Sequence, residues 1–95
     1  MNIKELHTEE KPVSATSIFK SDLGNATAIQ ILAGEKLKEH ITNLPALLIC
    51  ITGKVVFENE KGVNETLIPG DFVDIEPMVK HWIVGLLTSQ LLLIK

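Results

Sequence analysis

Short apolar runs separated by turn-forming residues recur about every ten residues from Val13 onward, a pattern typical of an all-β sandwich or barrel. By residue number, the expected strands are 17–20, 26–32, 37–42, 46–52, 54–58, 63–68, 71–75, 82–84 and 89–94. Residues 1–12 are polar and show no period, so we expect an arm or an edge strand there. The pattern predicts an all-β domain over residues 13–95.

No helix is expected in this domain. The best candidate, residues 35–40, spans only about a turn and a half, and an isolated helix of that length is marginal. Turn residues instead divide the chain. Residues 59–62 (Asn-Glu-Lys-Gly) predict a hairpin loop in which Gly62 takes a positive φ, and Pro69-Gly70 predicts a tight turn.

Strand alternation assigns side chains to the two faces of the predicted strands. In residues 46–52 it puts Leu48 and Cys50 on one face, together with Ala46 and Thr52. In residues 71–75 it turns Val73 and Ile75 toward the core and leaves Phe72, Asp74 and the following Glu76 outside. We expect the two carboxylates to be solvated, Phe72 to lie at a subunit interface, and Trp82 to pack in the core or an interface.

Composition removes several classes of partner. The net charge is −3, and the nine basic residues are all lysines. Without arginine a bidentate phosphate clamp is not expected, and without a basic surplus neither is nucleic-acid binding. Residues 46–51, the longest apolar stretch, fall far short of the ~20 residues of a membrane span, so a cytoplasmic protein is expected. The apolar fraction of 45% suggests that a partner subunit covers some side chains, which predicts a homodimer.

Two spaced motifs carry the candidate chemistry. In the first, Gly34 precedes five residues and then His40-Ile41-Thr42; Ala46 follows after three more residues, and Gly53 after another six. In the second, Gly70 precedes five residues, then Glu76-Pro77-Met78, two further residues and His81; Gly85 comes four positions later.

These spacings resemble the two motifs of the cupin superfamily, and the chain is similar to small single-domain cupins of the RmlC-like, cupin-2 type. The resemblance implies a double-stranded β-helix, or jelly-roll, barrel. It also implies a site inside the barrel. In metal-binding cupins, two histidines and a glutamate from the first motif and one histidine from the second converge there. Here His40 and His81 match the first and last of these places, whereas Thr42 and Ala46 occupy the other two.

Half of the implied metal set is therefore replaced. A catalytic metal site needs about three protein ligands, and two imidazoles provide two. Cys50, His7 or water molecules remain as completing ligands for a divalent ion such as Ni, Zn, Fe or Mn. The residues favour the absence of a metal, with Cys50 as a small buried side chain and His7 as a solvated residue of the arm.

Two main functional hypotheses follow. The favoured one is a non-enzymatic module that binds a small molecule in an apolar barrel interior lined by Leu48 and Cys50, with His40, Thr42 and His81 as polar contacts. The alternative is a metal-dependent dioxygenase or isomerase in which His40 and His81 are two of the ligands. Metal-free acid–base catalysis, as in sugar epimerases of this fold, is disfavoured because the chain has no tyrosine to serve as the second acid–base partner.

Overall fold

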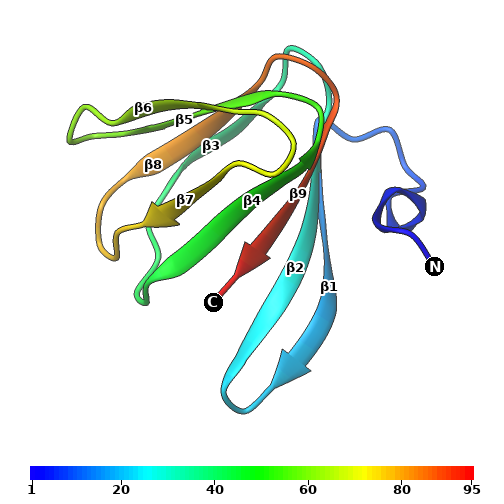
Figure 1. The fold of residues 1–95 in the computed structure, drawn as a ribbon, viewed down its shortest axis with the longest axis horizontal. Coiled ribbons are helices and arrows are strands. Elements are labelled where there is room, and N and C mark those ends of the chain that lie inside the picture. The colour runs from blue at the N-terminus through cyan, green and yellow to red at the C-terminus, as the bar shows by residue number, and fades with distance from the viewer.

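The computed structural model describes all of residues 1–95, and it is built almost entirely from β-strands (Figure 1). A short 3-10 helix, η1 (Ile3–Leu6), precedes the strands and contacts β2. The strands are β1 (Val13–Ser21), β2 (Gly24–Ile31), β3 (Lys36–His40), β4 (Ala46–Thr52), β5 (Val55–Asn59), β6 (Asn64–Leu67), β7 (Phe72–Ile75), β8 (His81–Gly85) and β9 (Ser89–Ile94). No helix has the length and apolar character needed to cross a membrane.

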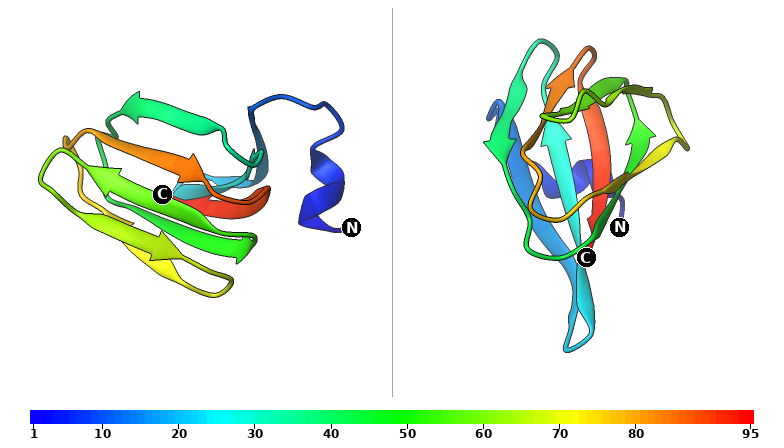
Figure 2. Two further views of the ribbon diagram at one scale, coloured as in Figure 1. Left: turned by 90° about the horizontal axis from the view of Figure 1, so that it is seen from above. Right: turned by 90° about the vertical axis from the view of Figure 1, so that its left-hand side faces the viewer.

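The strands form two facing antiparallel sheets (Figures 1 and 2). The order is β1-β2-β9-β4-β7 in the five-stranded sheet and β3-β8-β5-β6 in the four-stranded sheet. No strand pair joins the two sheets, so the barrel is open along its sides. The β1–β2 hairpin extends beyond the rest of the molecule, and η1 lies to one side of it (Figure 2). This arrangement confirms the predicted all-β, jelly-roll class.

The core fills the space between the sheets. Its largest fully buried side chains include Phe57, Leu48, Ile83 and Leu91, each at most 1% exposed. The alternation predicted for β4 is confirmed, because Ala46, Leu48 and Cys50 are buried while the residues between them are partly exposed. The predicted outward positions of Phe72, Asp74 and Glu76 are confirmed as well.

Most expected strands are present with ends shifted by a few residues, but the first is longer than predicted. The sequence pattern predicts a strand only over 17–20, whereas β1 begins at Val13. The earlier residues contain serine and threonine and alternate weakly. They are held in the strand by pairing with β2, where Val13 lies opposite Ile31 and Ala15 opposite Ile29. The short helix η1 was not expected, since a single turn leaves no hydrophobic period to detect.

The predicted turn glycines are confirmed by their backbone conformation. Gly34, Gly53, Gly62 and Gly70 have φ values of +80°, +92°, +89° and +94°. This left-handed region costs a residue with a Cβ about 1–2 kcal/mol. The matches to the two motifs at positions 34, 53 and 70 therefore follow from backbone geometry.

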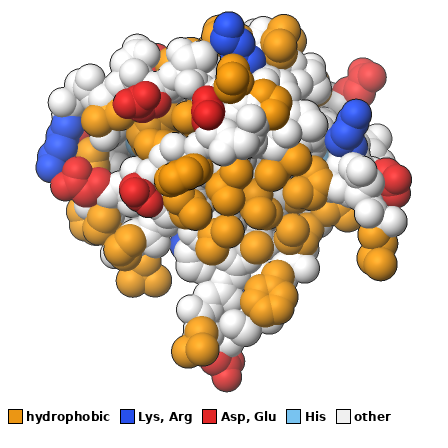
Figure 3. Space-filling view, in the orientation of Figure 1, with side chains coloured by type: hydrophobic (Ala, Val, Ile, Leu, Met, Phe, Trp, Pro, Cys, Tyr) orange, Lys and Arg blue, Asp and Glu red, His pale blue; other side chains and the backbone are white.

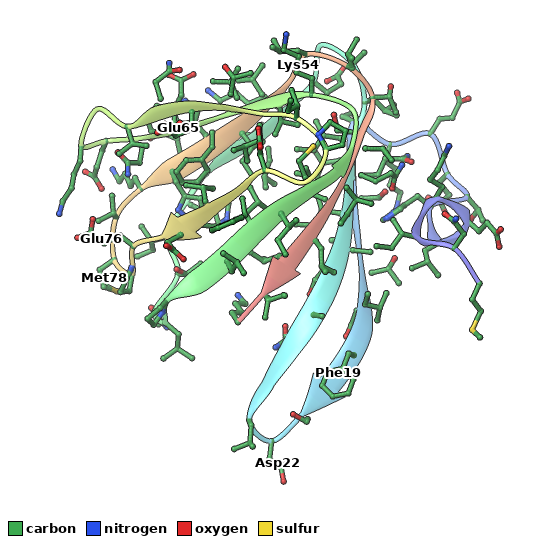
Figure 4. All side chains as sticks on the ribbon, in the orientation of Figure 1. Phe19, Asp22, Lys54, Glu65, Glu76 and Met78 are labelled. Atoms are coloured by element: carbon green, nitrogen blue, oxygen red, sulfur yellow. The ribbon has the colours of Figure 1, made fainter.

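Met78 stands where the cupin motif that the spacing resembles has a glycine, and it also adopts a left-handed conformation, with φ of 64°. It lies in the β7–β8 loop at the outer edge of the molecule (Figure 4), and its side chain is exposed. We expect Met78→Gly to raise the free energy of unfolding by about 0.5–1 kcal/mol, because glycine removes the Cβ strain at little cost in packing. Urea denaturation measures this, and Met78→Ala, which keeps the Cβ, should give no comparable gain.

Candidate functional site: a histidine pair beside an open groove

A β-bulge turns His40 toward the interior. Leu37 of β3 lies opposite Ile83 of β8, and His40 lies opposite His81. Three residue steps on β3 thus match two on β8, so one extra residue is inserted in β3. Without it, strict alternation from Leu37 would turn Glu39 inward and His40 outward. The bulge brings the histidines of the two motifs side by side.

The two imidazole rings are in direct contact. The Nε2 atoms of His40 and His81 are 3.0 Å apart, and the ring centroids are 4.1 Å apart in an edge-to-face arrangement. Each Nδ1 faces the backbone carbonyl oxygen two residues earlier, that of Lys38 at 3.0 Å and that of Val79 at 3.2 Å. His81 is 1% exposed, whereas His40 is partly exposed.

The carbonyl partners of the two Nδ1 atoms favour one arrangement of the protons. A carbonyl oxygen only accepts, so each Nδ1 carries a proton and donates it. When both imidazoles are neutral, neither Nε2 carries a proton, and the two Nε2 lone pairs face each other. The contact between His40 and His81 becomes a hydrogen bond only when one extra proton is present, which gives the pair a single positive charge.

Burial opposes this extra charge. It lowers the pKa of His81 below its ordinary value, and the charges of His40 and Lys95 lower it further, although the Val79 carbonyl raises it. Phe57 contributes to the dry surroundings, because its ring stacks on His81 with centroids 5.7 Å apart. His81 is therefore expected to be neutral at neutral pH.

The lowered pKa of His81 predicts a loss of stability in mild acid. The unfolded chain takes up this proton near pH 6.5, whereas the folded chain does so only at a lower pH. Between the two pKa values the unfolded state binds more protons, so the free energy of unfolding falls as pH falls, by at most about 1.4 kcal/mol per pH unit. Above pH 6.5 this contribution to stability is fully present.

Urea denaturation between pH 8 and about pH 5.5 tests this prediction. The His81→Gln variant should show a flatter dependence on pH than the wild type. Other titrating groups remain in both proteins, so the difference between the two curves isolates His81. Parallel curves would contradict the lowered pKa.

Of the other predicted site residues, Thr42 is buried, but its hydroxyl is hydrogen-bonded away from the histidines. Its hydroxyl donates to the carbonyl oxygen of Leu44 at 2.9 Å, and it makes no hydrogen bond with either histidine. Ala46, at the glutamate position of the first motif, is 7% exposed and belongs to the core cluster.

Cys50 lies near the opposite end of the barrel from the histidines. Its thiol donates to the carbonyl oxygens of Thr52 and Gly53, at the turn that leads into β5. His81 pairs with Asn59 at the far end of that strand, about 13 Å along. Burial, and then the charge of Asp71, raise the pKa of the Cys50 thiol. Cys50 is an inert core group. It does not lie with the histidines, contrary to the expectation from the sequence.

The residues present do not fit the metal centre that the resemblance implies. No cluster of three or more His, Cys, Asp or Glu side chains is placed to hold an ion. His7, the other proposed rescue, is held at β1 by a 2.7 Å hydrogen bond between its Nδ1 and the Ser14 hydroxyl. Two neutral imidazoles without a carboxylate fall short of the usual three ligands.

The apolar interior pocket that the sequence predicts is filled by packed side chains. Leu48 and Cys50 are both fully buried within the core cluster, and neither lines any of the four principal pockets of the protein. Phe57 and Ile83 pack into the same cluster. Alternation identified the inward face, but the volume left between the sheets depends on how the side chains of both sheets interdigitate.

An open groove instead reaches one of the histidines. It has a volume of about 530 Å³ and lies between the segment leading into β1 and strand β3, where the two sheets do not pair. We call it the β1–β3 groove; it is lined by Lys11, Pro12, Val13, Lys36, Leu37, Lys38 and His40. Among these lining residues, only His40 was predicted from the sequence to belong to the site. The run Lys36-Leu37-Lys38 was visible, but nothing local shows that residues 11–13 lie against it.

Gly85 stands where the cupin motif that the spacing resembles has an asparagine, and the fold explains this difference. Gly85 is buried, and a Cβ there would lie 2.8 Å from a methyl group of Ile31 and 2.9 Å from the carbonyl oxygen of Leu32. Its amide donates to the carbonyl oxygen of Glu35, and its own carbonyl accepts from Gly34. This crossing leaves no room for an asparagine side chain.

No protein-family model matches the chain, and no curated protein matches it. Solved structures do. A cupin superfamily protein from Desulfitobacterium hafniense is 19% identical with a TM-score of 0.85, over 98% of this chain and 84% of that protein. A cupin-2 domain protein from Shewanella frigidimarina is 14% identical with a TM-score of 0.81, over 100% and 92% of the two chains. KdgF from a Halomonas species is 18% identical with a TM-score of 0.76, over 90% and 81%.

Proposed function

We propose that this chain, which has the cupin fold, is a non-enzymatic module that binds a small molecule in the β1–β3 groove. His40 is the central polar contact of the site. The observation that supports this best is that His40 lines an open groove while its Nε2 lies 3.0 Å from that of the buried His81. A ligand in the groove thus contacts His40, whose ring is held in place by the Lys38 carbonyl and lies against His81.

The groove has the properties of a ligand site. Its volume of about 530 Å³ lies within the range of small-molecule pockets. Val13 and Leu37 pack against the core and give it an apolar floor, while His40 supplies a polar contact whose ring is held by the Lys38 carbonyl. Apolar walls with a few fixed polar groups are what small-molecule recognition requires.

The metal-dependent alternative has weaker support. It requires the pair to act as part of a metal centre, and the donor set around His40 and His81 lacks a third protein ligand.

Elemental analysis and ligand binding together test the proposal. We expect untagged protein to contain well below one metal ion per chain, and the His40→Ala and His81→Ala variants to have the same content. A small-molecule screen by amide NMR should find ligands that shift groove resonances, and His40→Ala should weaken their binding. Near-stoichiometric metal that is lost in both variants would overturn the proposal.

We also propose that the protein forms a homodimer through the outer face of the five-stranded sheet. Cross-strand pairing places two apolar rows on this face (Figure 3). The rows are Phe19-Ala26-Ile94-Leu47 and Leu92-Ile49-Phe72. Five strands about 4.8 Å apart and roughly 20 Å long give a face near 500 Å² in projection, which approaches the ~600 Å² per partner of a small interface.

Sedimentation equilibrium tests the dimer. The wild type should sediment at about twice its 10.5 kDa, and Phe72→Lys should weaken association by roughly tenfold or more, because it places a charge in the apolar face. Ile68→Lys, an exposed apolar position outside both rows, is the matched control and should leave the mass unchanged. A wild type that stays monomeric at high concentration would refute the dimer.

A further inference from the structure

The β1–β3 groove is positively charged, although the protein as a whole is acidic. The chain has twelve acidic and nine basic residues, yet the groove is lined by three lysines and a histidine and by no aspartate or glutamate. The histidine pair behind it also lacks a carboxylate, because no acidic side chain joins His40 and His81 in a cluster. The charged side chains that line the groove are therefore all lysines.

The three lysines differ in how far they are already engaged. Lys11 forms an ion pair with Glu9 at 3.0 Å, and the Lys36 ammonium lies 5.7 Å from the centroid of the Trp82 ring. Lys38 has no ion pair and no aromatic partner. Its ammonium is therefore free to meet an anion, and it lines the groove two residues from His40.

The rest of the lining is apolar. Pro12, Val13 and Leu37 provide carbon surface, and Val13 and Leu37 are partly buried against the core. A ligand that fits both parts has an apolar body and one anionic group. The absence of arginine favours a carboxylate over a phosphate, because a lysine offers a single point of charge and not the planar fork that clamps phosphate.

We infer that the ligand of the β1–β3 groove is a small amphipathic carboxylate, whose apolar body rests on Val13 and Leu37 and whose carboxylate meets Lys38. This rests on the proposed function, since it names the chemical class that the same site would take. The contact between the carboxylate and Lys38 lies at an open rim, where solvent screens it. It therefore adds little to the total affinity but distinguishes an anionic head group from a neutral or cationic one.

Three probes that share one apolar body separate the head groups: hexanoate, hexanol and hexylamine, each titrated into the full chain and followed by amide NMR shifts of the groove residues. We expect hexanoate to bind about two- to fivefold more tightly than hexanol, to exceed hexylamine by more because the lysines repel an amine, and to lose this advantage in high salt. Lys38→Gln should weaken hexanoate binding by about two- to fivefold without affecting hexanol. Lys61→Gln, an exposed lysine outside the groove that pairs with Glu76, is the matched control and should change nothing.

The outcomes separate the two ideas. If hexanol or hexylamine binds the groove as tightly as hexanoate does, the carboxylate inference is overturned while the binding module stands. An equal effect of Lys38→Gln on all three probes would also overturn it. If none of the probes shifts groove resonances, and no molecule of the wider screen does so, the proposed function itself fails.

Discussion

Gly53→Ala is expected to lower the free energy of unfolding by about 2–5 kcal/mol, which sums a left-handed backbone cost of ~1–2 kcal/mol and an overpacking cost of ~1–3 kcal/mol. Gly53 has φ of +92°, and an added Cβ would collide with the Ser89 hydroxyl and lie 2.6 Å from the carbonyl oxygen of Thr88. Ser89 is fully buried and cannot move freely, because its hydroxyl accepts from the amide of Lys54 at 2.9 Å and donates to Leu87 at 2.7 Å.

Two other motif glycines provide the control. Gly34 and Gly70 have φ values of +80° and +94°, but no atom lies within 4 Å of an added Cβ at either position. Gly34→Ala and Gly70→Ala should therefore show only the backbone cost, about 1–2 kcal/mol each. Urea denaturation of the three variants measures the difference. Equal losses at positions 34, 53 and 70 would mean that the crowding around Ser89 relaxes freely.

Phe57→Ala is expected to cost about 3–5 kcal/mol in the free energy of unfolding. Phe57 is the largest fully buried side chain, and truncation would leave a cavity at the centre of the core, beside His81. The same cavity should admit water to the His81 ring. Since burial is the main cause of its lowered pKa, the pKa of His81 should rise toward the ordinary value.

Denaturation and a histidine NMR titration together measure these two effects. Phe57→Leu is the matched control, because it keeps most of the apolar volume and should cost less than about 1.5 kcal/mol with little change at His81. If the Ala variant loses stability while the pKa of His81 stays low, then other side chains exclude water from the ring.

The all-β fold was predictable because its determinants are local. Alternation along β4 is a two-residue pattern that puts Leu48 and Cys50 on one face wherever the strand pairs. The turn at Gly62 likewise needs only a residue that tolerates a positive φ. The inward position of the histidines was expected from the motif spacing alone, since alternation along β3 would have turned His40 outward.

The candidate site depended on contacts between distant segments. Cys50 was expected beside the histidines because it shares their inward face. A face extends along the whole barrel, however, so it does not show which end a residue occupies. The five-residue strand β5, from Val55 to Asn59, separates the two ends. The groove escaped prediction for the same reason, because its two walls are some 25 positions apart in the chain.

By itself, the sequence determined the all-β class and the turn positions, because two-residue alternation and glycine conformation depend on neighbouring residues only. The two histidines were identified by the spacing of the two motifs. The tertiary structure alone decided three further features. It inserted the bulge that turns His40 toward His81, filled the interior where a pocket was expected, and opened the groove between residues 11–13 and β3. Each depends on how the two sheets pack and pair, and no local pattern in the chain encodes that packing.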